Sequence, residues 1–151
     1  MDSASSSVEI PGVYQVTDRL WQGSIFHVLR EWERVKPHID IAFLLGEPYG
    51  YPPQESDDPP FVVATIADDP NGCDCLNDVR EMVRRVKDQR VLFICAVGEN
   101  RSGLASALWL IEQGMTPDAA ISLLREKVKP NTTQPHVLWN PGFERQVRAL
   151  G

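Results

Sequence analysis

The sequence predicts an α/β protein with a central, mainly parallel sheet that helices cover on both faces. Three short apolar runs, at residues 39–45, 61–66 and 91–94, have the length of strands, and segments with helical spacing of apolar residues alternate with them. Nearly unbroken apolar runs are typical of strands that are buried on both faces. Strands that alternate with helices favour parallel pairing, because each helix carries the chain back across the sheet.

The N-terminal part predicts a hairpin, a helix and a long loop. Residues 13–20 alternate between apolar and polar types, so a small hairpin is expected through Trp21. Ser24 can cap a helix that ends at Pro37. Residues 46–60 are rich in proline, glycine and aspartate and predict a surface loop. The apolar stripe of the helix consists of Phe26, Leu29, Trp32 and Val35.

Four more helices are predicted in the second half of the chain from apolar periodicity and capping residues. A helix over residues 102–113 stops at Gly114, and residues 129–138 form an irregular stretch. The other three helices are expected to start at Asp74 or Asn77, at Thr116-Pro117 and at Asn140-Pro141. The first of these three carries Leu76, Val79, Met82, Val83 and Val86 on one face.

The composition indicates one domain in a reducing compartment. With 151 residues, the chain is expected to fold as a single domain over residues 11–151, after a flexible lead of residues 1–10. The net charge of −6 argues against long nucleic acids and anionic membranes as partners. Three cysteines are too few for a disulfide framework, and neither a secretory signal nor a membrane-spanning run is recognisable. These features predict a cytoplasmic monomer.

The stretch from Cys95 to Arg101 has the features of an anion-binding loop. An apolar strand places Cys95 at the carboxyl edge of the sheet, a helix begins after Arg101, and Gly98 allows a tight backbone between them. Backbone N–H groups and the helix dipole can bind a phosphate, and Arg101 can bind two of its oxygens. The same field favours the thiolate at Cys95, and Ser102 can donate a hydrogen bond to the departing sulfur. The residues expected to bind substrate are Ala96, Val97, Gly98, Glu99, Asn100 and Arg101.

This loop resembles the C-x5-R-S/T signature of protein tyrosine and dual-specificity phosphatases. Residues 18–24 resemble the family's early hairpin and residues 140–146 its closing helix, so the resemblance covers residues 13–150. It implies a dual-specificity phosphatase-like fold and a mechanism without metal or other cofactor. In that mechanism the Cys95 thiolate attacks the phosphate, and the cysteinyl phosphate is then hydrolysed. The sequence departs from the family at Ile94, where most members have a histidine that ties the loop down.

The mechanism that the resemblance implies needs a general acid. The family places an aspartate on the loop after the strand that precedes the nucleophile's strand, and here that loop contains Asp68 and Asp69. Strand alternation puts Asp68 on the same side as Ala64 and Ile66, which favours Asp68, while alignment to the following helix can favour Asp69. The other aspartate is expected to cap the turn.

The charge of the loop side chains predicts how many phosphates the substrate carries. Family members that cleave phosphoinositides tend to have lysine or arginine there, whereas this loop has neutral residues and Glu99. We expect Glu99 to repel additional phosphates, so that the substrate is a singly phosphorylated protein or a small phosphomonoester. Phosphotyrosine is the first candidate, with phosphoserine and phosphothreonine beside it. Tyr49 and Tyr51 either form a pocket wall for an aromatic ring or lie in an ordinary surface loop.

Three alternative functions and one further role remain open. The loop also suits a rhodanese-type sulfurtransferase, a non-catalytic module that binds phosphate or a phosphopeptide, or a phosphatase that acts on RNA 5′ ends. Cys73 and Cys75 either pack in the interior or pair with an oxidised Cys95 and protect it. Two cysteines alone do not make a zinc site, so no metal is expected.

Overall fold

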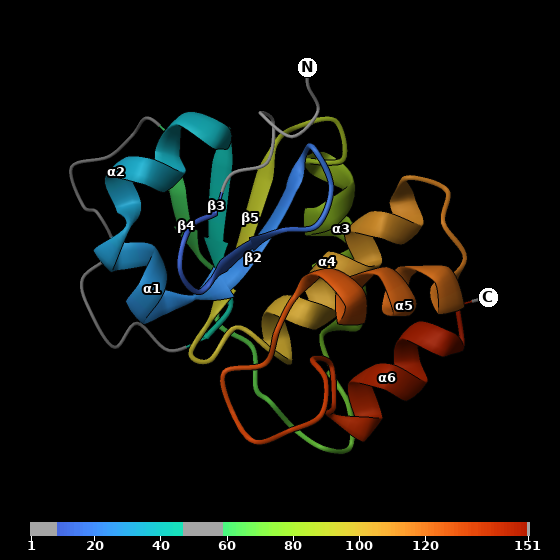
Figure 1. Ribbon diagram of the computed structural model, residues 1–151. Helices are drawn as coiled ribbons and strands as arrows, with labels where there is room; N and C mark the ends of the chain where they lie inside the picture. The colour runs from blue at the N-terminus through green and yellow to red at the C-terminus, as the bar shows by residue number, and fades with distance from the viewer. Residues whose placement is uncertain (1–8, 47–58, 151) are drawn as a thin grey trace.

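A single five-stranded sheet forms the centre of the molecule (Figure 1). The computed structural model describes residues 9–46 and 59–150. In this part of the chain the strand order is β1-β2-β5-β3-β4, and every neighbouring pair is parallel except β1 with β2. This confirms the predicted mainly parallel sheet. The strands are β1 (Val13–Gln15), β2 (Leu20–Ser24), β3 (Ile41–Leu44), β4 (Phe61–Val63) and β5 (Val91–Cys95).

Helices cover both faces of the sheet, as predicted (Figure 1). One face carries α1 (Ile25–Arg30), α2 (Trp32–Val35) and the 3-10 turn η2 (Lys36–His38), and the other carries α3 (Leu76–Arg85), α4 (Arg101–Glu112), α5 (Pro117–Lys127) and α6 (Pro141–Arg148). Alternate residues of β5 enter the two core layers: Leu92 and Ile94 pack towards α1 and α2, and Val91 and Phe93 towards α3 to α6. None of the helices in the described residues is both long and apolar enough to cross a lipid bilayer.

The carboxyl ends of the parallel strands meet at one edge of the sheet. Ser24, at the end of β2, lies in register with Cys95, at the end of β5, and Leu44 of β3 lies opposite Ile94. The helices α1 and α4 both begin at this edge. The fold therefore brings three strand ends and two helix N-termini together, which is the usual place for a ligand in an open α/β sheet.

The predicted N-terminal helix differs from the observed one in its length and its face. Ser24 does cap α1, since its Oγ accepts from the His27 N–H, but α1 ends at Arg30 and a separate helix follows. Phe26 was expected in the apolar stripe, yet it is 59% exposed. The stripe that is buried consists of Ile25, Val28, Trp32 and Val35. The buried residues are spaced by three, four and three positions, as a helix requires, whereas the predicted stripe was spaced by three throughout and so began one residue too late.

Three other boundaries differ from the predictions. The run at residues 61–66 was expected to be a strand buried on both faces, but β4 is a three-residue edge strand whose Val63 is 46% exposed. The helix α3 begins at Leu76, with Cys75 rather than Asp74 or Asn77 at its N-cap position. Ile10, which was expected in the flexible lead, is buried in the core layer against α1 and α2. The other predicted caps are confirmed: Thr116, Asn140 and Gly114, whose φ is +102°.

Candidate active site

Cys95 is the last residue of β5 and lies at the base of the loop that leads into α4. It is 1% exposed, and its Sγ is 3.1 Å from the hydroxyl oxygen of Ser102, which is itself fully buried in the first turn of α4. A hydroxyl at this distance can donate a hydrogen bond to sulfur. The predicted pairing of Cys95 with Ser102 is therefore present in the structure.

The backbone carbonyls of three successive loop residues are each held by a donor from outside the loop. The pairs are Asn131 Nδ2 to Val97 O (2.8 Å), Gln22 Nε2 to Gly98 O (2.9 Å) and Leu138 N to Glu99 O (3.0 Å). Because a trans peptide group points its N–H away from its carbonyl, the N–H groups of residues 98 to 100 face the inside of the loop. Convergent N–H groups form a cradle for an anion, and the N-terminus of α4 adds its positive dipole there.

Gly98 is required in the loop for two reasons. Its φ is +73°, a left-handed conformation that side chains disfavour. A Cβ at this position would also lie 2.8 Å from both the Gly23 carbonyl carbon and the Ser24 nitrogen at the end of β2. The loop therefore packs directly on the backbone at the end of β2, and this close contact leaves no room for a side chain at Gly98.

The Arg101 side chain contacts the segments that follow β3 and β4. Its Nη1 donates to the carbonyl of Ile66 (3.4 Å), in the segment after β4. A Cβ at Gly46 would lie 3.2 Å from Arg101 Nη2 and 3.0 Å from the Ala96 nitrogen, so the bare backbone of Gly46 covers both groups. The guanidinium therefore lies against the segments that follow β3 and β4.

Asp68 is hydrogen-bonded directly to the loop, and Asp69 is not. The Asp68 carboxylate accepts from Asn100 Nδ2 (3.2 Å) and from Asn140 Nδ2 (2.6 Å). Asp69 instead accepts from the N–H of Asn71, two residues on, which is the capping of a turn. The geometry therefore favours Asp68 as the acidic group of the site.

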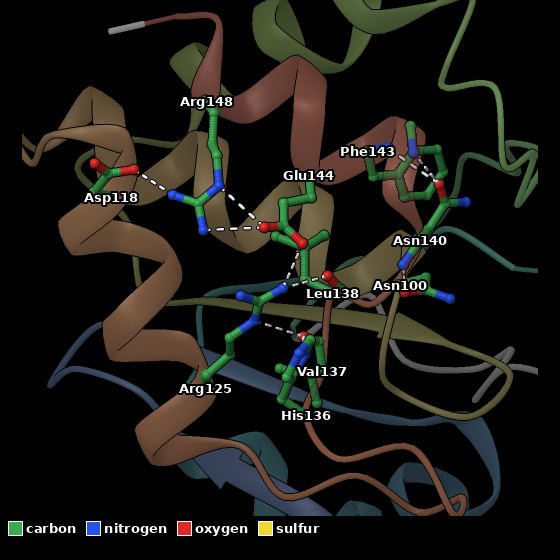
Figure 2. A network of polar contacts seen from close by, with 11 residues as sticks. Asn100, Asp118, Arg125, His136, Val137, Leu138, Asn140, Phe143, Glu144 and Arg148 are labelled. Carbon is green, nitrogen blue, oxygen red and sulfur yellow. Dashed lines mark hydrogen bonds and ion pairs between the residues drawn. The ribbon is translucent and has the colours of Figure 1, made fainter.

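Asn140 joins three parts of the site through one amide. Its side-chain oxygen accepts from the N–H groups of Gly142 and Phe143 and so caps α6, while its Nδ2 reaches Asp68 and the carbonyl of Asp69. Its backbone N–H donates to Asn100 Oδ1, as Figure 2 shows. In the sequence Asn140 is recognisable only at the start of a helix, because no local pattern reveals its contact with Asp68, 72 residues earlier.

The orientation of Glu99 is a correction to the sequence analysis. Its carboxylate was expected to face the substrate and repel phosphates, but the residue is 0% exposed and its carboxylate accepts three hydrogen bonds from residues 131–139. Only the backbone of Glu99 belongs to the cradle. Among the neutral residues of the loop, Val97 is 39% exposed, Ala96 is half-buried and Asn100 is buried.

Cys73 and Cys75 contact each other, with their sulfurs 3.1 Å apart. Neither is hydrogen-bonded to Cys95, so of the two roles left open by the sequence the structure gives no support to the pairing with that residue. Burial raises the pKa of the Cys73 thiol to about 12, and its contact with Cys75 contributes to the rise. Among the described residues, no three histidine, cysteine, aspartate or glutamate side chains gather as a metal site requires. Tyr49 and Tyr51 lie outside the described residues.

Solved structures with a similar fold include dual-specificity and tyrosine phosphatases and a phosphatase-like protein. Human DUSP28 matches with a TM-score of 0.70 at 17% identity over 92% of both chains. Tk-PTP in its active form matches with a TM-score of 0.71 at 18% identity over 93% of this chain and 99% of that one. The human tyrosine phosphatase-like serine/threonine/tyrosine-interacting protein matches with a TM-score of 0.69 at 18% identity over 91% of this chain and 94% of that one.

At these identities the matches establish a common architecture. No protein-family model matches the sequence, and the search of curated proteins found no match. This chain therefore has the fold of the dual-specificity and tyrosine phosphatases.

Proposed function

We propose that this protein is a cysteine-dependent phosphatase that hydrolyses phosphate monoesters through a phosphocysteine intermediate. The observation that carries the proposal is the cradle: three carbonyls held from outside the loop leave the N–H groups of residues 98–100 facing its inside, in the loop that begins at Cys95. Anion-binding N–H groups beside a cysteine supply both the binding site and the nucleophile. The shared fold of phosphatases supports the same conclusion.

In the first step the Cys95 thiolate attacks phosphorus, and the bond from phosphorus to the leaving oxygen breaks. Asp68, in its protonated form, gives its proton to that oxygen, so that an alcohol or phenol leaves rather than an alkoxide or phenolate. The loop N–H groups and Arg101 bind the three other phosphate oxygens, whose charge they stabilise in the transition state.

In the second step a water molecule attacks the phosphocysteine, and the sulfur leaves as the thiolate. The Asp68 carboxylate, now without its proton, takes one from the water and returns to its starting form. The Ser102 hydroxyl, 3.1 Å from Sγ, donates a hydrogen bond that stabilises the departing sulfur. Inorganic phosphate then leaves the cradle.

We propose a singly phosphorylated substrate, with phosphotyrosine first and phosphoserine or phosphothreonine next. The support differs from the original expectation, because Glu99 points away from the site. The loop still has no lysine or arginine between Cys95 and Arg101. Additional phosphates on a substrate would therefore find no further cationic side chain within the loop.

A second candidate is a module that binds phosphate without turnover. Two observations favour it: Ile94, before the nucleophile, has an apolar side chain buried in the core layer against α1, and one structural match is named phosphatase-like. The measurement below separates the two candidates.

Hydrolysis of p-nitrophenyl phosphate and phenyl phosphate without added metal tests the proposal. Cys95→Ser should abolish turnover and still bind tungstate. Asp68→Ala should lower kcat by about 100-fold or more on phenyl phosphate, and by less on p-nitrophenyl phosphate, because p-nitrophenolate leaves without much help from an acid. Asp69→Ala is the matched control and should keep its kcat, because its carboxylate serves the turn.

Two outcomes would contradict the proposal. Tungstate binding by a wild-type protein that hydrolyses neither ester would favour the binding module. If Asp69→Ala lost activity and Asp68→Ala kept it, the general acid would be Asp69.

A further inference from the structure

Glu99 is a fully buried carboxylate in the middle of the candidate phosphate loop. A buried carboxylate is costly unless hydrogen bonds compensate for the lost hydration. Two donors reach Oε1, Trp139 Nε1 at 2.7 Å and Thr132 Oγ1 at 2.9 Å, and the Asn131 N–H reaches Oε2 at 2.8 Å. This set of donors is specific to a carboxylate at this position, because both of its oxygens are used.

All three donors belong to the connecting segment, residues 129–139, between α5 and α6. The same segment supplies two of the three donors that hold the loop carbonyls, Asn131 to Val97 and Leu138 to Glu99. The backbone N–H of Asn131 binds the Glu99 carboxylate while its side chain binds the Val97 carbonyl. The carboxylate thus holds Asn131 in place, and Asn131 in turn orients the peptide group between Val97 and Gly98.

The connecting segment is anchored on its other side by Arg125 of α5. Figure 2 shows this guanidinium between Glu144 and the segment. It donates to the carbonyls of Val137 (3.1 Å) and Leu138 (2.8 Å) and pairs with Glu144 of α6 (2.8 Å). Leu138 has a φ of +54°, an uncommon conformation for leucine that the surrounding contacts hold in place. Glu99 therefore connects the loop to a segment with an independent anchorage.

We propose that Glu99 is a positioning residue for phosphate binding: its carboxylate holds the connecting segment so that the loop N–H groups converge on the phosphate. The proposal rests on the proposed phosphatase function for the identity of the bound group. Without the carboxylate, Asn131 loses one of its two attachments to the loop, and the Val97 carbonyl loses its fixed partner. The N–H of Gly98 belongs to that same peptide group, so its direction is then no longer fixed.

The test compares Glu99→Ala and Glu99→Gln with the wild type by calorimetric binding of tungstate, kcat and KM for phenyl phosphate, and Tm. Glu99→Ala should weaken tungstate binding by about tenfold or more and lower kcat/KM by about 100-fold, the size of the loss of one anion-binding donor. Glu99→Gln keeps an oxygen for Trp139 and Thr132 but turns an NH2 group towards the Asn131 N–H, so its tungstate affinity should lie between those of Glu99→Ala and the wild type.

Asp40→Ala is the matched control. Asp40 also accepts several hydrogen bonds, from Arg90, but at the amino ends of β3 and β5, on the opposite edge of the sheet. This variant should lower Tm and leave tungstate affinity and kcat/KM unchanged. If Glu99→Ala likewise lowered Tm but left tungstate affinity and kcat/KM unchanged, the role of the carboxylate would be structural and the inference would be wrong. Tighter tungstate binding in Glu99→Ala would also contradict it, because the charge would then oppose the anion.

Two further variants keep the inference testable if Glu99→Ala does not fold. Trp139→Phe and Thr132→Val each remove one donor to Glu99 and should each weaken tungstate binding by a few-fold. Unchanged affinity in both would contradict the inference. A wild type that binds tungstate without turnover would contradict only the proposed phosphatase. If the wild type hydrolyses phenyl phosphate and a folded Glu99→Ala has the same tungstate affinity and kcat/KM, only the positioning role would be contradicted.

Discussion

Side-chain amides organise the candidate site at the level of single residues. Gln22 and Asn131 each orient one carbonyl of the loop, and Asn140 connects Asp68 to the start of α6. An amide carries donors and an acceptor together, so one asparagine can cap a helix and bind a carboxylate at the same time. A carboxylate in place of Asn140 could do only the first, and it would face Asp68 with a like charge.

Cys73 should resist alkylation in the native protein. Burial raises its pKa from an ordinary value of 9.0 to about 12, so its thiolate fraction at pH 8 falls by about a thousandfold. A short pulse of iodoacetamide, followed by mass spectrometry of the peptides, should label Cys73 at least about 100-fold more slowly in native than in urea-unfolded protein. Cys75→Ser removes the neighbouring sulfur and should restore part of the rate. Equal labelling in native and unfolded protein would contradict the prediction.

Cys95 and Arg101 stood out because they belong to a local strand–loop–helix pattern, and the candidate acids Asp68 and Asp69 came from the resemblance to the phosphatase family. The direction of Glu99 was not predictable in that way. Its partners Thr132 and Trp139 lie 33 and 40 residues further along the chain, and hydrogen-bond donors at that distance leave no local pattern. The expected repulsion of phosphates failed because it assumed that a loop side chain faces the solvent.

At the level of elements, two helices begin with the same local signal and have different neighbours. Thr116-Pro117 caps α5 and Asn140-Pro141 caps α6, and both caps accept from backbone N–H groups of the first turn. Only the cap of α6 also reaches the loop with the candidate acid. The first turn of α6 passes so close to the backbone at Gly72 that a Cβ at Gly142 would collide with it.

Asn140→Ala and Thr116→Ala should separate stability from turnover. Each variant should lose about 1–2 kcal/mol of unfolding free energy in urea, the usual cost of an N-cap. Asn140→Ala should also lower kcat on phenyl phosphate by about tenfold or more, because Asp68 loses its shortest hydrogen bond. Thr116→Ala should keep the wild-type kcat. Equal kcat values in the two variants would mean that Asn140 has no role in placing the acid.

Periodicity predicted where helices occur better than it predicted which face is buried. In the N-terminal helices the expected stripe included Phe26, which is exposed, and omitted Ile25, which is fully buried. Ile25 directly follows Ser24, the last residue of β2, and it lies in the same buried stripe as Val28, against Ile94 of β5 in the core layer. The short edge strand β4 was overestimated for a related reason, because an apolar run does not show whether a second neighbour exists.

At the level of the whole molecule, ion pairs fasten the C-terminal helices to one another. Glu144 of α6 accepts from Arg125 and Arg148, and Arg148 also pairs with Asp118 of α5 (Figure 2). Burial alone would raise the pKa of Glu144, but the hydrogen bonds from the two arginines outweigh it, so the net shift is downward. At the opposite edge of the sheet, hydrogen bonds from Arg90 lower the pKa of Asp40.

These shifts predict how stability depends on pH. A carboxylate whose pKa is lower in the folded state stabilises the protein above its unfolded pKa, 4.5 for Glu144, and that contribution is lost as the pH falls through the folded value. Urea unfolding should show Glu144→Gln less stable than wild type at pH 7 by about 1 kcal/mol or less, and the two should converge towards pH 3. Glu126→Gln, an exposed glutamate on α5, serves as the control. A difference that is the same at both pH values would contradict the assignment.

The architecture of the sheet was predictable because parallel strands and crossover helices follow one another along the chain, whereas the cradle depends on segments far apart. This has a consequence for biosynthesis. Asn140 follows Asn100 by 40 residues, and the donors Asn131 and Leu138 also come late. A nascent chain that has left the ribosome only as far as α4 already carries the cysteine and the arginine, but it lacks two of the three donors that orient the loop. During synthesis the chain therefore acquires its candidate nucleophile well before the candidate phosphate site can form.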